Sequence, residues 1–145
     1  MEIGDVVKIG KWNDRSLEWY FLDTMQNSDL LFLCCAGLLK TSFINLDNVM
    51  AEFSKDFSKP NKARIGLMSV EAAIHYQQGK FMKLSRNIND DVLDWWLLPH
   101  NKRDMADVLK EQFPPYFDDE NGQIVEKGDR ASSTKWFRPV IILKK

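Results

Sequence analysis

Metal ligands and disulfide-forming residues are scarce in this chain. It has two cysteines, Cys34 and Cys35, and two histidines, His75 and His100. A structural zinc site takes about four Cys or His ligands, and a disulfide between neighbouring cysteines is strained and closes no useful loop. We therefore expect no metal and no cofactor, with both cysteines present as thiols in an apolar strand, where free cysteine is often buried.

An excess of charge of either sign is also lacking. The 20 Lys and Arg residues nearly balance the 21 Asp and Glu residues, which leaves a formal net charge of −1 at pH 7. Proteins that bind nucleic acids usually carry a basic surface, and a protein that imitates DNA needs a large acidic excess. The sequence thus predicts no nucleic-acid partner.

No hydrophobic run of the sequence approaches the roughly 18 residues of a membrane span. The opening Met-Glu-Ile-Gly-Asp has no basic region followed by an apolar stretch, which a secretory signal would need. We expect a cytoplasmic protein without membrane contact, in which the thiols stay reduced. The length of 145 residues predicts a single domain over residues 1–145.

Apolar residues follow strand-like patterns along much of the chain. Such runs predict strands at 5–10, 17–25, 30–36, 65–68, 92–98, 113–118, 123–126 and 136–143. The first three of these strands form an N-terminal meander. Asn121 and Gly122 predict the turn of a hairpin between residues 113–118 and 123–126.

Helical spacing of apolar residues predicts two main helices. One spans residues 46–57, with Asn45 as its cap, and the other begins after the cap Ser69 and stops at Gly79. A charged segment at 102–110 is expected to be a helical insertion, and residues 80–94 are expected to be mostly loop. Strands together with helices predict the α+β class.

Motifs of catalysis are not found in the sequence. Neither His75 nor His100 belongs to a recognisable Ser-His or Cys-His motif, and no glycine-rich phosphate loop is present. We therefore expect no enzyme activity.

The acidic run at 118–122 resembles part of a calcium loop. Aligning its Gly122 with the glycine of such a loop places Phe117 at the first ligand position and Gly128 where the bidentate glutamate belongs. Calcium binding is therefore not expected, and the run is interpreted as a solvated hairpin tip.

Aromatic and basic residues remain as candidates for a binding site, because Trp and Arg are enriched at interaction hot spots. The candidates are Trp12, Arg15, His100, Arg130 and Trp136. Trp19, Trp95 and Trp96 stand in apolar runs, so we expect them in the core. Trp95 and Trp96 should point to opposite faces of one strand.

Arg138 stands between Phe137 and an apolar strand, where a charged group must find partners. The following Pro139 restricts it to an extended conformation. We expect its guanidinium to reach a carboxylate or several backbone carbonyls. The alternative is an exposed arginine at a sheet edge.

Six segments in order resemble an uncharacterised bacterial and phage family, a domain-of-unknown-function family whose members share Trp-Trp-Leu-Arg-Ser-Pro and Val-Arg-Pro motifs. The segments are residues 4–10, 17–22, 31–33, 65–72, 95–99 and 137–141. The family is similar to C-type-lectin-like and sulfatase-modifying-factor folds. The resemblance implies a C-type-lectin-like domain with mostly antiparallel sheets and two main helices.

The resemblance also bears on function. Modifying-factor enzymes use a late pair of copper-binding cysteines, whereas Cys34 and Cys35 are early and adjacent, so the scaffold is implied but not that activity. We expect a non-catalytic recognition module that binds another protein and is encoded by a phage or mobile element, with inhibition of a host system as one form. The alternatives are an enzyme of unrecognised type and a structural or assembly subunit of a phage particle.

Overall fold

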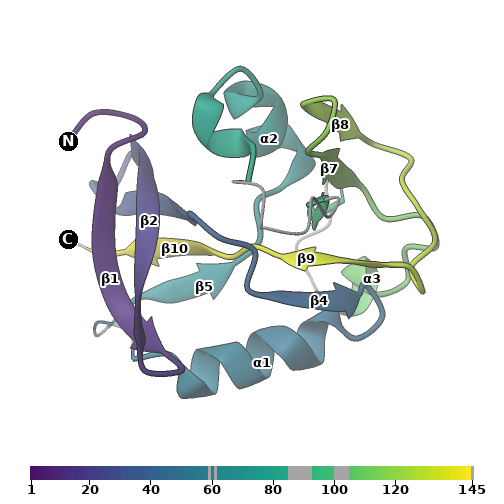
Figure 1. The fold of residues 1–145 in the computed structure, drawn as a ribbon, viewed down its shortest axis with the longest axis horizontal. Coiled ribbons are helices and arrows are strands. Elements are labelled where there is room, and N and C mark those ends of the chain that lie inside the picture. The colour runs from purple at the N-terminus through teal and green to yellow at the C-terminus, as the bar shows by residue number, and fades with distance from the viewer. Residues whose placement is uncertain (59, 61, 85–92, 100–104, 145) are drawn as a thin grey trace.

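The computed structural model describes residues 1–58, 60, 62–84, 93–99 and 105–144. In this part of the chain, ten strands form two five-stranded sheets, and two main helices pack against them (Figure 1). The expected α+β class is confirmed. The sheets are mostly antiparallel, since among the described pairs only β6 and β9 run parallel. The C-type-lectin-like assignment stays a prediction.

The first sheet has the expected N-terminal meander at one side. Its strands, in spatial order, are β1 (Val6–Trp12), β2 (Arg15–Thr24), β3 (Leu30–Cys34), β10 (Val140–Leu143) and β5 (Arg64–Gly66). A two-residue turn joins β1 to β2, with φ angles of 51° at Asn13 and 61° at Asp14. Positive φ at both turn residues is the geometry that matches the twist of a hairpin.

The second sheet contains the β7–β8 hairpin that Asn121 and Gly122 predict. Its strands, in spatial order, are β4 (Leu39–Ser42), β9 (Thr134–Phe137), β6 (Trp95–Trp96), β7 (Tyr116–Asp118) and β8 (Gln123–Val125). Strand β4 has no counterpart in the sequence-based prediction. The strand expected at 92–98 is shorter, although Leu98 still forms an isolated bridge to Ser69.

The single strand expected at 136–143 is wrong. The chain leaves the second sheet at Phe137 and enters the first sheet at Val140. Pro139 cannot donate a backbone hydrogen bond, so a sheet-to-sheet crossing suits it better than the middle of a strand.

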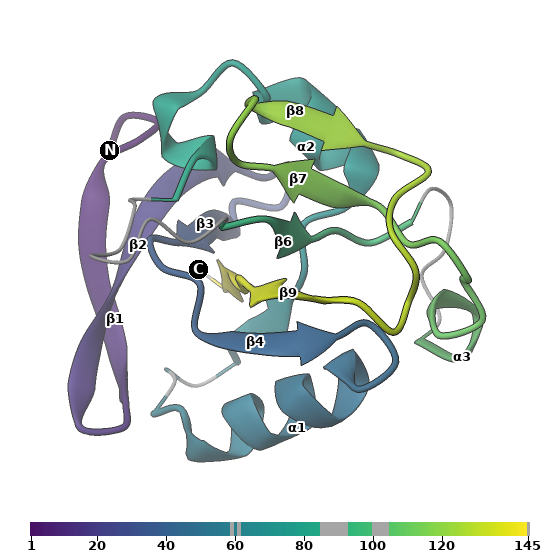
Figure 2. The same cartoon turned by 45° about the vertical axis from the view of Figure 1, so that its right-hand side comes forward.

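Helix α1 (Leu46–Asp56) lies along β4, and α2 (Val70–Tyr76) lies behind β7 and β8 in Figure 2. The short helices are η1 (Lys80–Met82) and α3 (Met105–Val108). Helix α3 falls within the expected insertion at 102–110. The expected loop at 80–94 is described only in part and contains η1, and its residues 85–92 lie outside the described residues. No helix of the described chain is long and apolar enough to cross a membrane.

The two helix caps behave differently. Ser69 Oγ accepts a hydrogen bond from the backbone N–H of Ala72 at 3.1 Å, as expected of a cap. Asn45 occupies the cap position of α1 but makes no capping hydrogen bond there. Its Oδ1 accepts instead from the side chain of Asn48 at 3.0 Å, so Asn45 holds the expected cap position without the hydrogen bond of a cap. Helix α2 ends before Gly79, whose N–H donates to the carbonyl of Tyr76.

Trp95 and Trp96 are both fully buried and belong to two different hydrophobic clusters. The ring centres of Trp96 and Phe43 are 5.3 Å apart, and Nε1 of Trp96 donates to the carbonyl oxygen of Thr41 at 2.8 Å. The ring centres of Trp95 and Phe117 are 5.2 Å apart. The prediction that they point to opposite faces of one strand is confirmed.

Arg138 is fully buried where the chain crosses between the sheets. Its Nε donates to the carbonyl oxygen of Cys34 at 2.7 Å. Its terminal nitrogens donate to the carbonyl oxygens of Met82 and Phe81, each at 2.6 Å. The expectation that the guanidinium reaches several carbonyls is confirmed. Burial lowers its pKa to about 10, so the group stays charged at neutral pH.

The hairpin tip is less solvated than expected, because Asp119 is buried. Its carboxylate accepts a hydrogen bond from the backbone N–H of Leu84 at 2.6 Å. Its own N–H donates to Oδ1 of Asp94 at 3.1 Å. The tip therefore folds back on the segment that follows η1, and the solvated interpretation holds only for exposed residues such as Glu120.

Candidate functional site

A pocket of about 540 Å³ lies beside the β1–β2 hairpin. We call it the hairpin pocket, and residues 12–13, 15–18 and 34–38 line it. Trp12 and Arg15 are directly paired across the two strands, so the structure brings together two of the five predicted binding residues.

The two aromatic and basic residues of the hairpin pocket are held differently. Trp12 is half-buried, and its ring meets Phe53 of α1 edge-on at 5.7 Å. Arg15 is exposed, and within the described part of the chain its guanidinium has no hydrogen bond or ion pair. The hairpin pocket therefore combines the Trp12 ring, which packs against the core, with the exposed guanidinium of Arg15, whose N–H donors can bind a carboxylate.

The thiols that line the hairpin pocket are poor nucleophiles. Cys34 is buried and Cys35 is half-buried, and both are free. Burial raises the pKa of Cys34 to about 11 and that of Cys35 to about 12. Since the thiolate is the reactive form and the metal ligand, neither cysteine is prepared for covalent chemistry at neutral pH.

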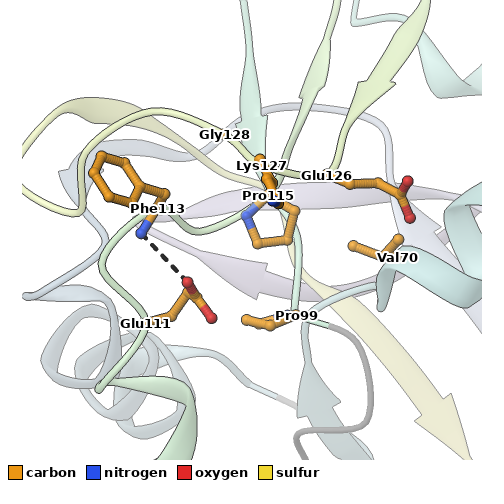
Figure 3. A pocket seen from close by; sticks show the side chains of 8 residues that line it. All are labelled: Val70, Pro99, Glu111, Phe113, Pro115, Glu126, Lys127 and Gly128. Carbon is orange, nitrogen blue, oxygen red and sulfur yellow. Dashed lines mark hydrogen bonds between the residues drawn. The ribbon is translucent and has the colours of Figure 1, made fainter.

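A second pocket, of about 560 Å³, opens where the second sheet meets the start of α2. We call it the Phe113 pocket, and it is lined by Val70, Pro99, Glu111, Phe113, Pro115, Glu126, Lys127 and Gly128. In Figure 3, Phe113 and Glu111 lie on one side of Pro99 and Pro115, and Val70 and Glu126 lie on the other.

Apolar groups dominate this second pocket. Val70 is fully buried, and Pro99 and Pro115 are buried, so they belong to the rigid body of the domain. Phe113 is 50 % exposed and is the only aromatic residue among the exposed large apolar side chains of the described chain. The backbone N–H of Phe113 donates to Oε1 of Glu111 at 3.4 Å, as drawn in Figure 3.

The wall of the Phe113 pocket depends on a glycine. A Cβ atom at Gly128 would collide with the carbonyl oxygen of Pro114. Because glycine has no Cβ atom, the two segments can approach, and the N–H of Gly128 donates to the carbonyl oxygen of Phe113 at 3.3 Å. The segment after β8 thus lies directly against the segment before β7, and the two are held as one wall.

Trp136 and Arg130, which were also predicted to bind, line neither pocket. Trp136 is half-buried in β9, with Lys40 Nζ 5.8 Å from its ring centre, and its buried Nε1 has no hydrogen-bond acceptor among the described residues. Arg130 is exposed in the loop between β8 and β9, two residues after Gly128. His100 lies outside the described residues.

Phe113 was not among the predicted binding residues. Its sequence neighbours Gln112, Pro114 and Pro115 were a usable signal, because an isolated aromatic beside two prolines fits no regular strand. The strand expected at 113–118 begins only at Tyr116. The other walls come from distant parts of the chain and give no local signal.

A buried cation lies between the rings of the second sheet. Lys135 Nζ is 3.9 Å from the centre of the Tyr116 ring and 5.5 Å from that of Trp96. It also lies 3.4 Å from Asp129 and 3.7 Å from Asp94. Burial raises the pKa of Asp94. The pKa of Asp129 is lowered, chiefly by a hydrogen bond from the backbone N–H of Arg130. The ammonium is enclosed by its partners, which suits a structural role.

No group of three or more His, Cys, Asp or Glu residues in the described chain is placed to hold a metal ion. Comparison of the chain with protein-family models, with curated proteins and with solved structures gives no match in any of the three. The resemblance to the bacterial and phage family therefore stays a prediction.

Proposed function

We propose that this domain is a non-catalytic recognition module that binds another protein. The observation that carries the proposal is the half-exposed Phe113 beside a mostly apolar pocket of about 560 Å³. A concave apolar pocket with a few polar groups is the usual form of a binding site. An aromatic or aliphatic anchor seated in such a pocket supplies much of the energy of a protein interface.

Two further features support recognition over catalysis. The thiols of Cys34 and Cys35 are held in the protonated form by burial. The amine of Lys135 is enclosed by rings and carboxylates, so it is poorly placed to reach a substrate. In this proposal Phe113 and the prolines beside it receive an apolar side chain of the partner, and the Trp12–Arg15 hairpin pocket is the second surface to test.

The test begins with cross-linking of the chain in a bacterial lysate, followed by mass spectrometry that identifies the protein captured. The purified partner is then titrated against the wild type, Phe113→Ala and Arg15→Ala. Arg15 is exposed, so Arg15→Ala should change stability by less than about 0.5 kcal/mol. Phe113 is 50 % exposed, so Phe113→Ala should cost on the order of 1 kcal/mol, and its urea midpoint is measured first to show that the variant is folded.

Phe113→Ala should weaken binding at least about tenfold, which is the range of a hot-spot residue. Arg15→Ala should change it much less. The reverse ranking would move the interface to the hairpin pocket. Unchanged binding by both variants would reject both surfaces, and turnover of a small molecule by the purified chain would reject the non-catalytic function.

A further inference from the structure

A third hollow, of about 360 Å³, lies between the end of α2, η1 and the β7–β8 turn. We call it the lysine pocket. Residues 77–80, 82–83, 117 and 121–122 line it. Helix α2 and the β7–β8 hairpin each reach the Phe113 pocket at one end and the lysine pocket at the other, as the residues that line the two pockets show.

The charged residues among the described lining of the lysine pocket are of one sign. Within that described lining only Lys80 and Lys83 are charged, and together they contribute a formal charge of +2 on a chain whose net charge is −1. Both side chains are exposed, and neither ammonium has an ion pair within the part of the chain that the structure describes. Two unpaired cations at one concave site attract an anion.

Gly122 helps to place one of these cations. Its φ angle is +66°, as a turn glycine requires, and a Cβ atom there would lie 3.0 Å from Cε and 3.6 Å from Nζ of Lys83. The lysine stem therefore lies along the open side of the glycine. The turn and the ammonium are brought together by this close approach.

The carboxylates of the nearby turn are already engaged. Asp118 accepts hydrogen bonds from the backbone N–H and the side-chain amide of Asn121, at 3.3 and 2.8 Å. Asp119 is buried and accepts from Leu84. Burial raises the pKa of this carboxylate, and the positive charge of Lys83, which also acts on it, lowers that pKa by less. Glu120 is exposed at the tip but does not line the pocket.

Neutral groups complete the pocket. The side-chain amides of Gln77 and Gln78 are exposed and have no hydrogen bond within the described residues, so each offers two donors. Met82 and Phe117 lie beneath the pocket, but both are fully buried and offer no accessible surface. The accessible groups of the pocket are its cationic and amide donors.

We propose that the lysine pocket binds an acidic segment of the partner protein, with carboxylates at Lys80 and Lys83 and the donor amides of Gln77 and Gln78 beside them. This inference rests on the proposed function and names the chemistry of the partner. Charge complementarity is its basis, because like-charged partners would be repelled and acidic ones steered to the site.

The experiment is an NMR titration of the ¹⁵N-labelled chain with the capped peptide Asp-Leu-Asp-Glu. The isosteric neutral peptide Asn-Leu-Asn-Gln and inorganic phosphate serve as the other two probes. The amide signals of Gly79 and Gly122 should shift with the acidic peptide and not with the neutral one. Phosphate, a small anion with one charged centre, cannot place separate carboxylates at both lysines and should shift them only at clearly higher concentration.

The double variant Lys80→Gln/Lys83→Gln should weaken binding of the acidic peptide about threefold to tenfold, since each exposed ion pair contributes modestly. The matched control is Lys8→Gln/Lys55→Gln, which removes two exposed lysines of β1 and α1 and should leave binding unchanged.

Equal shifts with the neutral peptide would overturn the proposal, as would equal affinity for phosphate, which would mean a simple anion site. No shift at millimolar acidic peptide would also overturn it. If an identified partner loses affinity for Phe113→Ala but binds Lys80→Gln/Lys83→Gln normally, the lysine pocket fails while the proposed function stands.

Discussion

The guanidinium carbon of Arg138 lies 4.8 Å from the centre of the Trp95 ring. The two residues belong to the chain crossing and to the second sheet, and the same guanidinium binds carbonyl groups of Cys34, Phe81 and Met82. One side chain thus connects β3 of the first sheet, η1 and the aromatic core of the second sheet. The carbonyl groups accept from three of the five N–H donors of the buried guanidinium, and the aromatic face adds a favourable contact with its charge.

Replacing Arg138 with Lys should destabilise the domain by about 1–3 kcal/mol, because Lys keeps the charge but lacks the planar fork that reaches three carbonyls. The measurement is the urea midpoint with its slope. Arg130→Lys is the control, since Arg130 is exposed, and it should leave the midpoint unchanged. A wild-type midpoint for Arg138→Lys would show that the hydrogen bonds contribute little.

The two cap positions offer a matched comparison. Ser69→Ala should cost about 1 kcal/mol of unfolding free energy, because its Oγ accepts from the Ala72 N–H. Asn45→Ala should cost clearly less, because Asn45 makes no capping bond. Chemical denaturation of both variants checks this. Equal losses would mean that cap position, and not the observed hydrogen bond, sets the effect.

Asp119 predicts a pH dependence of stability. Desolvation raises its folded pKa above the model-compound value of 3.8, so the folded state binds the proton more tightly than the unfolded state does. As pH rises from about 4 through the folded pKa, this carboxyl lowers the stability of the wild type. Asp119→Asn keeps an acceptor oxygen but does not titrate, so it should gain stability relative to the wild type over that range.

Asp129 is the control of opposite sign. Its pKa is lowered, chiefly by the hydrogen bond from the N–H of Arg130, so its stabilising contribution is present above the unfolded pKa and is lost as pH falls. The difference between the wild type and Asp129→Asn should therefore shrink on acidification. Urea denaturation between pH 3 and pH 6, roughly the range in which carboxyls titrate, checks both signs, and parallel profiles for the two variants would contradict the assignment.

The thiols should react slowly in the folded state. With pKa values of about 11 and 12, Cys34 and Cys35 should be alkylated by iodoacetamide at pH 8 at least about 100-fold more slowly than an unperturbed thiol, because the thiolate is the nucleophile. Mass spectrometry of alkylation with and without urea measures the ratio. Rapid labelling of the folded chain would show that the hairpin pocket exposes a thiolate.

Local patterns in the sequence determined much of the secondary structure. The 3.6-residue spacing over residues 46–57 predicted α1, and alternation over residues 5–10 predicted β1, because side-chain periodicity reflects which face of an element is buried. The aromatic residues at 17–25 predicted β2, and the continuous apolar run at 30–36 predicted β3. Asn121 and Gly122 predicted the β7–β8 turn, since the turn needs a positive φ that Gly122 supplies. Strand geometry alone predicted that Trp95 and Trp96 point to opposite faces of one strand.

The tertiary structure decided how these elements meet. Pro139 is a local sign of a break in the apolar run at 136–143, but only pairing with different sheets assigns one half to β9 and the other to β10. The buried Asp119 accepts a hydrogen bond from Leu84, which is distant in sequence. The Phe113 pocket joins α2 to the ends of three strands of the second sheet. Such sites depend on contacts between residues far apart in the chain, and the free energy of these contacts does not appear in any local pattern.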